Sequence, residues 1–261
     1  MNTVTTGEPV LSMRMISKHF GAVTALRDVN LDVHSGEVVA LVGDNGAGKS
    51  TLVKVLAGVH AQDEGTIVFD GAPVKINNPH DSIEAGIATV FQDLALCDNL
   101  DVVNNLFLGR ELGPARLDEV TMELRAWELL RELSAKIPSV RLPIASLSGG
   151  QRQTVAIARS LLGEPKLIML DEPTAALGVE QTAEVLNLIE RLREKGLAVI
   201  VVSHNMDDVF AVADRIVVLR LGSNNGEFVP SKATKDDIVA AITGSADNAV
   251  STRALRVTQG N

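Results

Sequence analysis

The sequence feature that most constrains the fold is a glycine-rich loop that directly follows a short apolar segment. Segment 37–42 is almost entirely apolar, and it runs into the octapeptide Gly43-Asp44-Asn45-Gly46-Ala47-Gly48-Lys49-Ser50. A glycine, four residues and then Gly-Lys-Ser is the spacing of a P-loop, which lies between a strand and a helix. Segment 51–56 continues as a plausible helix. The chain is therefore predicted to contain an α/β core with a P-loop.

The composition of this loop suits the binding of a nucleotide phosphate. Small residues let backbone amides converge on an anion, and the helix that begins near Ser50 adds its own N-terminal amides. Lys49 can reach the β- and γ-phosphates, and the Ser50 hydroxyl can ligate Mg²⁺. The alternative, a chance glycine-rich turn, is disfavoured by the flanking strand and helix. We expect nucleotide contacts from Gly43, Asp44, Asn45, Gly46, Ala47, Gly48, Lys49, Ser50 and Thr51.

A second apolar strand ends in two carboxylates. Segment 167–170 is Leu-Ile-Met-Leu, and Asp171 and Glu172 follow it. In open parallel sheets, ligands bind at the carboxyl ends of the strands. Asp171 can hold Mg²⁺ there, and Glu172 can polarise the water that attacks the γ-phosphate. By itself such a segment is more often a plain strand–loop junction, but the P-loop favours the functional interpretation.

The rest of the chain divides into three kinds of segment. The N-terminal part reads as strands, with a turn signal at Asp70-Gly71. In segment 120–137, apolar residues recur at helical spacing, namely Val120, Leu124, Trp127, Leu130 and Leu133, so 93–147 is interpreted as a helical insertion. Afterwards helices at 151–162 and 180–195 alternate with apolar strands at 166–170 and 197–202, which predicts a parallel sheet covered on both faces.

Composition excludes several functional classes. The 261 residues carry a net charge of −9 and no basic run, which argues against nucleic-acid binding. The longest apolar runs fall far short of the roughly 20 residues that span a bilayer. Cys97 is the single cysteine, so no intrachain disulfide can form. The N-terminus lacks the pattern of a secretion signal, and we therefore expect a cytoplasmic location.

A third motif makes the sequence resemble the ATPase family of ABC transporters. Leu147-Ser148-Gly149-Gly150-Gln151 is similar to that family's signature, and it lies between the P-loop and the acidic strand. Ser148 and the amides of Gly149 and Gly150, at a helix N-terminus, can form a second anion cradle together with Gln151. The resemblance implies that the signature of one subunit covers the ATP on the P-loop of another. One P-loop and one signature thus imply a dimer, most simply a homodimer.

The resemblance also assigns roles to residues outside these motifs. Gln92 corresponds to a glutamine that contacts Mg²⁺ and the attacking water, and it lies where the core meets the helical insertion. His204 corresponds to a histidine that contacts the γ-phosphate, and Phe20 to an aromatic residue that stacks on adenine. Taken alone, His204 and Phe20 would more often be structural. Gly178 departs from the pattern, because many family members carry an aspartate there in a loop that crosses the dimer interface.

The resemblance covers nearly the whole chain and implies an ABC ATPase fold over residues 8–243. Within it, 8–92 and 148–243 form the α/β core and 93–147 the helical subdomain, while 244–261 is expected to be a flexible tail. The catalytic set is then Glu172, His204, Lys49 and Gln92, the Mg²⁺ ligands are Ser50, Gln92 and Asp171, and the nucleotide is ATP.

The variants of these motifs resemble the ribose-, xylose- and fructose-type import ATPases of bacteria. This implies transmembrane permease subunits as partners, an extracytoplasmic sugar-binding protein as an indirect one, and a place on the cytoplasmic face of the membrane. An ABC ATPase for another cargo remains an alternative, because it would share every catalytic residue. A non-transport ABC ATPase is a weaker alternative, because the chain is a single cassette and is acidic. A P-loop small-molecule kinase is also weaker, because it would not carry the signature.

Overall fold

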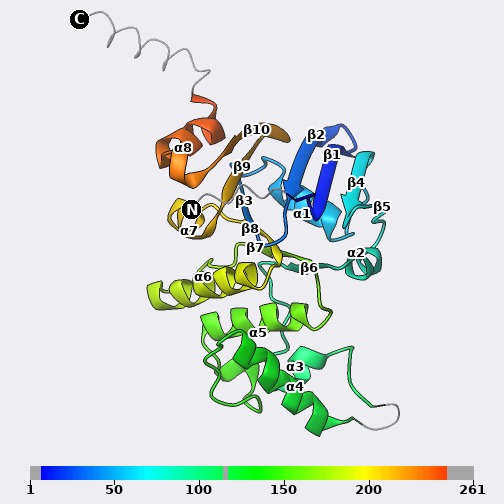
Figure 1. Cartoon of the computed structure of the whole chain (residues 1–261), viewed down its shortest axis with the longest axis vertical. Helices are drawn as coiled ribbons and strands as arrows, with labels where there is room; N and C mark the ends of the chain where they lie inside the picture. Colours follow the sequence, from blue (N-terminus) through cyan, green and yellow to red (C-terminus); the bar gives the residue numbers. More distant parts are fainter. Residues whose placement is uncertain (1–6, 114–116, 246–261) are drawn as a thin grey trace, which may run out of the picture.

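The computed structural model describes residues 7–113 and 117–245, which form two sheets and their covering helices (Figure 1). The smaller sheet is antiparallel, with strand order β2-β1-β4-β5. Its strands are β1 (Leu11–Phe20), β2 (Val23–Val33), β4 (Glu64–Phe69) and β5 (Ala72–Val74). The predicted Asp70-Gly71 turn joins β4 to β5, with φ values of 51° and 76° that suit a tight hairpin.

The larger sheet has strand order β10-β9-β3-β8-β7-β6. Its strands are β3 (Val38–Val42), β6 (Ile87–Val90), β7 (Leu167–Asp171), β8 (Ala198–Val202), β9 (Arg215–Arg220) and β10 (Ser223–Phe228). The first five of these are mutually parallel, as predicted, and β10 adds an antiparallel edge that the sequence interpretation did not include. The parallel arrangement sets the carboxyl ends of β3, β8, β7 and β6 along one edge.

Helices cover both faces of the larger sheet and form the region below it in Figure 1. They are α1 (Lys49–Leu56), α2 (Pro79–Ala85), α3 (Val102–Phe107), α4 (Glu119–Glu132), α5 (Gly149–Leu161), α6 (Val179–Glu194), α7 (Met206–Val212) and α8 (Lys235–Thr243), with short 3-10 turns at Ile144–Ser146 and Pro230–Lys232. None of the helices within these described residues is long and apolar enough to cross a membrane. Beyond Ser245, the predicted tail lies outside the described residues.

Alternate residues of the central strands enter two different cores. Val199 and Val201 of β8 pack with the helical side, in a core shared with α3, α4, α5 and α6. Ile200 and Val202 of the same strand pack with α1 and the antiparallel sheet. A strand that is buried on both faces reads as a continuous apolar run, which is why these segments are recognisable in the sequence.

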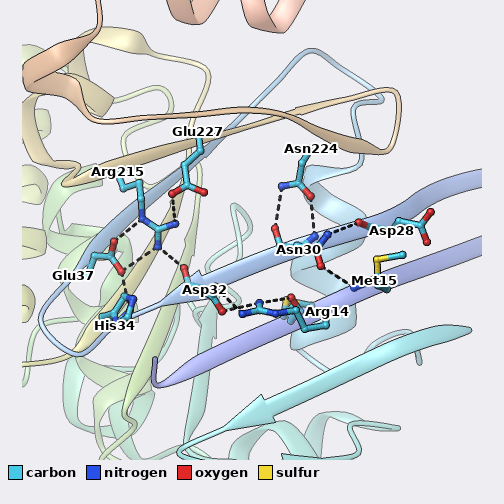
Figure 2. Close-up of polar contacts among 11 residues, drawn as sticks. Arg14, Met15, Asp28, Asn30, Asp32, His34, Glu37, Arg215, Asn224 and Glu227 are labelled. Atoms are coloured by element: carbon cyan, nitrogen blue, oxygen red, sulfur yellow. Dashed lines mark hydrogen bonds and ion pairs between the residues drawn. The ribbon is translucent and has the colours of Figure 1, made fainter. Parts of the chain in front are cut away.

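A polar network joins the antiparallel sheet to the larger one (Figure 2). Arg215 in β9 donates to the Glu37 carboxylate at 2.8 Å and to the backbone oxygen of Asp32 at the end of β2. The side chain of Asn224 in β10 accepts from the backbone amide of Asn30 at 2.8 Å and donates to its carbonyl oxygen at 2.9 Å. These contacts fix the orientation of β2, which lies against the P-loop.

Only part of the apolar pattern that predicts a helix in segment 120–137 is buried in α4. Val120 and Leu124 are 71% and 59% exposed, whereas Met122, Ala126 and Leu130 are buried. These three follow an i, i+4, i+8 spacing, so they form one stripe, and Val120 and Leu124 lie roughly 120° and 160° around the helix from the centre of that stripe. The helix also ends at Glu132, earlier than the predicted 137. Two apolar stripes on one helix made the choice of buried face ambiguous from the sequence.

Candidate functional site

The P-loop connects β3 to α1, and its backbone requires glycine at two positions. Gly43 has a φ of 152°, and a Cβ there would lie 2.3 Å from the carbonyl oxygen of Leu219 in β9. Gly48 has a φ of 106°, and its Cβ would lie 2.8 Å from the Leu26 side chain and 2.9 Å from the Ala25 carbonyl in β2. The loop is therefore pressed between two strands, and its outer side is open.

The first turn of α1 is left without a side-chain cap. Gly48 is the N-cap residue, and no side chain accepts from the first amides of the helix. Uncapped amides at a helix N-terminus, together with the helix dipole, favour a bound anion. Lys49 folds over the loop, where its ammonium donates to the carbonyl oxygens of Gly43 at 2.6 Å and Asp44 at 3.1 Å. The predicted phosphate cradle thus has the shape and charge of an anion site.

The strand order brings four predicted motifs to one edge of the larger sheet. The P-loop follows β3, His204 follows β8 and Gln92 follows β6. Asp171 is the last residue of β7, and Glu172 comes directly after it. These strands are neighbours in the order β3-β8-β7-β6 and all run parallel. Residues up to 161 positions apart in the chain therefore share one site (43 to 204).

Glu172 and His204 are in direct contact. The Glu172 carboxylate lies 2.8 Å from Nδ1 of His204, and its side chain is only 16% exposed, against 75% for His204. The backbone amide of Glu172 donates to the carbonyl oxygen of Val202 in β8. Its φ is 51°, a left-handed conformation that is unfavourable for a residue with a side chain and that clusters at functional sites. The fold thus holds this carboxylate in a defined place.

Asp171 is half-buried among charges of both signs. Burial raises its pKa, the neighbouring Glu172 carboxylate raises it further, and the cations Lys49 and Lys54 oppose the shift. Asp171, the Ser50 hydroxyl and the Gln92 amide are oxygen ligands of the kind that Mg²⁺ prefers. In the described residues no group of three His, Cys, Asp or Glu side chains is placed to hold a metal ion. The three predicted Mg²⁺ ligands all offer oxygen, so their chemistry suits this ion.

The signature motif begins helix α5. Ser148 is the N-cap residue; its hydroxyl accepts from the Gln151 amide at 3.3 Å, and the Gln151 side chain accepts from the Ser148 amide at 2.9 Å. This reciprocal pair is a capping box. Gln151 also donates to the carbonyl oxygen of Lys136 at 2.8 Å. The helix starts two residues earlier than the predicted 151, so Gly149 and Gly150 form its first turn.

The signature contacts helix α6 and the loop before it, in its own chain, instead of the P-loop. A Cβ on Gly149 would lie 2.8 Å from the Leu177 side chain, and a Cβ on Gly150 3.1 Å from Cβ of Gln181. Among residues 7–113 and 117–245, no hydrogen bond or ion pair joins Ser148 or its neighbours to the P-loop. The structure therefore does not bring the two predicted anion cradles together within one chain.

Phe20 ends β1 and is 43% exposed. Its ring meets His60 edge-on, with centroids 5.1 Å apart, and the Lys18 ammonium lies 5.6 Å from its centroid. Lys18 in turn donates to Asp63 at 2.6 Å, and this bond contributes most to lowering the pKa of Asp63 to about 2. The exposed ring is thus held from two sides, and its role in adenine stacking stays a prediction.

The sequence interpretation missed one set of contacts near Gln92. Arg159 of α5 donates to the carbonyl oxygens of Leu94 and Ala95 at 2.7 and 2.8 Å. A cavity of about 270 Å³ adjoins these bonds and is also lined by Phe91 and Arg110. An arginine inside an amphipathic helix carries no local signal of such a role. The contact joins the loop between β6 and α3 to the helix that carries the signature.

Comparison with known proteins identifies the family of the chain. Residues 26–175 match the family model of the ABC transporter. The fructose import ATP-binding protein FrcA of Rhizobium meliloti is 43% identical, over 91% of this chain and 95% of its own. The xylose/arabinose import ATP-binding protein XylG of Sulfolobus acidocaldarius is also 43% identical, over 90% and 92%. The chain therefore belongs to the ABC transporter family, among its ATP-hydrolysing subunits, as its motifs predicted.

Solved structures agree with this assignment. A nucleotide-free ATP-binding cassette from an ABC transporter has a TM-score of 0.76 at 27% identity, covering 90% of this chain and 95% of its own. A dimeric cassette in a post-hydrolysis state, bound to ADP and Pi, has a TM-score of 0.71 at 29% identity, covering 84% and 98%. The predicted fold, a P-loop core with an antiparallel β subdomain and a helical insertion, is confirmed.

Proposed function

We propose that two copies of this chain bind ATP and Mg²⁺ between them and that hydrolysis of this ATP energises the import of a monosaccharide. The observation that carries the proposal is the separation of the two anion cradles. The P-loop and the signature both present helix N-termini, yet they make no polar contact within the described chain. Each cradle is completed when a second copy supplies the other half.

The P-loop residues 43–51 hold the phosphates, with Lys49 turning from the Gly43 carbonyl oxygen to the β- and γ-phosphates. Phe20 stacks on adenine through its exposed face. Ser50, Gln92 and Asp171 would hold Mg²⁺, and its charge would offset the negative charge of the β- and γ-phosphate oxygens. The partner's signature then approaches the γ-phosphate with its Ser148 hydroxyl and helix dipole.

Glu172 is the general base of this proposal. Its carboxylate accepts the proton of the attacking water, whose oxygen forms the new bond to the γ-phosphorus while the bond to the β–γ bridging oxygen breaks. His204, which is 2.8 Å from that carboxylate, orients it and can contact the γ-phosphate from its exposed side. The left-handed backbone at Glu172 keeps the carboxylate at the sheet edge.

Relatives supply the support for the dimer and for the cargo. A dimeric cassette among the solved structures has the same fold. The relatives that are more than 40% identical are named as import ATP-binding proteins for fructose, xylose/arabinose and ribose. The match spans 95% of the fructose protein and 48% of the ribose protein RbsA of Caldanaerobacter subterraneus. A single cassette that forms a homodimer, with fructose-type cargo, fits this pattern.

A permease must supply the path through the membrane, and an extracytoplasmic sugar-binding protein would deliver the sugar. We expect the permease to hold the ATPase at the cytoplasmic face and to contact it near Gln92. That glutamine is exposed, and the neighbouring cavity separates the core from the helical insertion. The net charge of −9 argues against nucleic acid as a partner.

Two measurements test the proposal. Purified chain with Mg²⁺ and ATP should release phosphate, and Glu172→Gln should lower turnover roughly 10²- to 10³-fold while ATP still binds, as expected for loss of a general base. Near-normal turnover in this variant would remove Glu172 from its role. Pull-down of tagged chain from detergent-extracted native membranes should recover a multispanning permease and a sugar-binding protein. Recovery of ribosomes, or of no membrane protein, would refute the transport function.

A further inference from the structure

Strand β1 loses one of its two neighbours before it reaches Phe20. Its pairing with β4 ends at Ser17 and Glu64, whereas its pairing with β2 continues to Phe20 and Val23. The remaining ladder is irregular, because its register shifts on both sides of Lys18. The last three residues of β1 therefore form a sheet edge, and the open side of that edge needs other hydrogen-bond partners.

Asp63 takes the place of the missing neighbour. It directly precedes β4, and its backbone amide donates to the carbonyl oxygen of Ser17 at 2.9 Å. Its carboxylate accepts from the backbone amide of His19 at 2.6 Å and from the Lys18 ammonium at 2.6 Å, and it lies 3.2 Å from Nδ1 of His19. A side-chain carboxylate thus continues the hydrogen bonding that β4 no longer provides, up to the residue before Phe20.

The ring of Phe20 has two polar neighbours, and both belong to this arrangement. The Lys18 ammonium, which is bonded to Asp63, lies 5.6 Å from the ring centroid, within the range of a cation–π contact. His60, three residues before Asp63, meets the ring edge-on. A ring that is 43% exposed gains little orientation from apolar packing, so the position of these neighbours largely sets its direction.

The segment that carries Asp63 is continuous with the phosphate site. Helix α1 begins in the P-loop, and beyond its end the amide of His60 donates to the carbonyl oxygen of Lys54 at 3.2 Å. One stretch of chain, 43–63, therefore contains both the predicted phosphate cradle and the carboxylate that holds the end of β1. A nucleotide with its phosphates on the P-loop and its base on Phe20 would be oriented at both ends by this stretch.

We propose that Asp63 is a positioning residue for the nucleotide base, because it fixes the end of β1 so that the Phe20 ring is in place before the nucleotide binds. The inference rests on the proposed function, in which Phe20 stacks on adenine. A ring that is already ordered loses less conformational entropy on binding than a mobile one, and the difference appears as affinity. Asp63 acts through Phe20 alone, so its loss should weaken binding and leave the rate of hydrolysis unchanged.

The test compares two ligands by calorimetric titration with Mg²⁺: ADP, and pyrophosphate, which has the two phosphates without the base. Asp63→Ala should weaken ADP binding roughly two- to tenfold, the range expected when one side chain must be immobilised on binding. Pyrophosphate binding should be unchanged, which also shows that the variant is folded. In steady-state turnover the KM for ATP should rise while kcat stays at the wild-type value.

A conservative variant separates the charge of Asp63 from its hydrogen bonding. Asp63→Asn keeps an oxygen that can accept from the His19 amide, but it loses the charge that attracts the Lys18 ammonium. Its affinity for ADP should lie between those of wild type and Asp63→Ala. An affinity below that of Asp63→Ala would contradict the inference, because the retained acceptor would then give no support to the end of β1.

A double-mutant cycle shows whether Asp63 acts through the ring. In a chain that carries Phe20→Ala, adding Asp63→Ala should not weaken ADP binding further, because the ring that it positions is absent. Asp32→Asn is the matched control, since Asp32 pairs with Arg14 of the same strand at 2.7 Å, away from Phe20. It should leave the affinities for ADP and pyrophosphate unchanged.

The outcomes distinguish the inference from the function on which it rests. If Phe20→Ala weakens ADP binding and Asp63→Ala binds like wild type, the inference is wrong and the proposed function stands. The inference is also wrong if Asp63→Ala weakens pyrophosphate binding as much as ADP binding, because Asp63 would then support the P-loop instead of the ring. If Phe20→Ala itself leaves ADP affinity unchanged, both the inference and the stacking role of Phe20 are overturned.

Discussion

Helices α1 and α5 both begin in glycine-rich segments, yet they satisfy their first amides in opposite ways. The first turn of α1 has Gly48 as N-cap and no side-chain acceptor. The first turn of α5 has Ser148 as N-cap and a reciprocal capping box with Gln151. One N-terminus is open to an external anion, and the other is already closed by its own side chains.

The glycines of the two segments also differ in what they avoid. Gly43 and Gly48 avoid collisions with backbone atoms of β9 and β2 and have positive φ values. Gly149 avoids the end of a leucine side chain, which can move, and lies in regular helix. The conformation of the P-loop is thus determined by backbone contacts with neighbouring strands, and that of the signature by hydrogen bonds of its own side chains. This difference predicts that substitutions in the two segments fail in different ways.

The largest effect is expected from Gly48→Ala. The added methyl group would meet the Ala25 carbonyl at 2.9 Å with a φ of 106°, so the loop must distort. We expect ATP affinity to fall at least 100-fold, measured by titration calorimetry of the monomer. Gly149→Ala is the matched control and should leave monomer affinity within about threefold, because only the ends of the Leu177 and Gln181 side chains must move. Equal losses in the two variants would contradict the contrast between the segments.

This contrast could be read only in part from the sequence. The P-loop, the acidic strand and the signature are contiguous, so each motif carries its own local signal. The order β3-β8-β7-β6, which places Glu172 against His204, depends on pairing between distant segments. Likewise, Val120 and Met122 of α4 are both apolar, and only tertiary packing decides that Met122 is the buried one. Local patterns thus predicted the parts of the site better than their placement.

The second prediction concerns the capped cradle. Ser148→Ala removes the N-cap acceptor, which stabilises a helix by roughly 1 kcal/mol, and it removes the hydroxyl offered to the partner's nucleotide. We expect ATP turnover to fall about 10- to 100-fold, while ATP binding to the monomer stays unchanged. Phosphate release and monomer titration together check this. A loss of monomer affinity would show that the signature acts within its own chain, against the separation of the cradles.

The third prediction concerns the aromatic ring beside the P-loop. Phe20→Ala removes the stacking surface while leaving the glycine loop intact, and base stacking on an aromatic residue stabilises binding by about 1–3 kcal/mol. ATP affinity should fall roughly 5- to 50-fold, with turnover at saturating ATP little changed. Phe20→Trp should restore most of the affinity, since it retains an aromatic face. Failure of tryptophan to rescue would indicate that the ring only packs against His60.

The smallest effect is expected at Gln151, and it separates the two tasks of the capping box. The Gln151 side chain accepts from the Ser148 amide and donates to the Lys136 carbonyl oxygen. Gln151→Glu keeps the acceptor, as in a serine–glutamate capping box, but loses the donor. Its melting temperature should therefore lie between those of wild type and Gln151→Ala, which loses both bonds and should melt about 1–4 °C lower.

Turnover distinguishes positioning by Gln151 from direct contact with the partner's nucleotide. If Gln151 only holds Ser148 in place, Gln151→Glu should keep turnover within about twofold, whereas Gln151→Ala should lose roughly threefold. If its side chain reaches the partner's γ-phosphate, the added negative charge should make Gln151→Glu the worse enzyme of the two, because like charges repel across a closed interface. The first outcome is expected, because the oxygen and the nitrogen of the Gln151 side-chain amide both form hydrogen bonds within its own chain. The reverse ranking would mean that the cap opens when the two copies close.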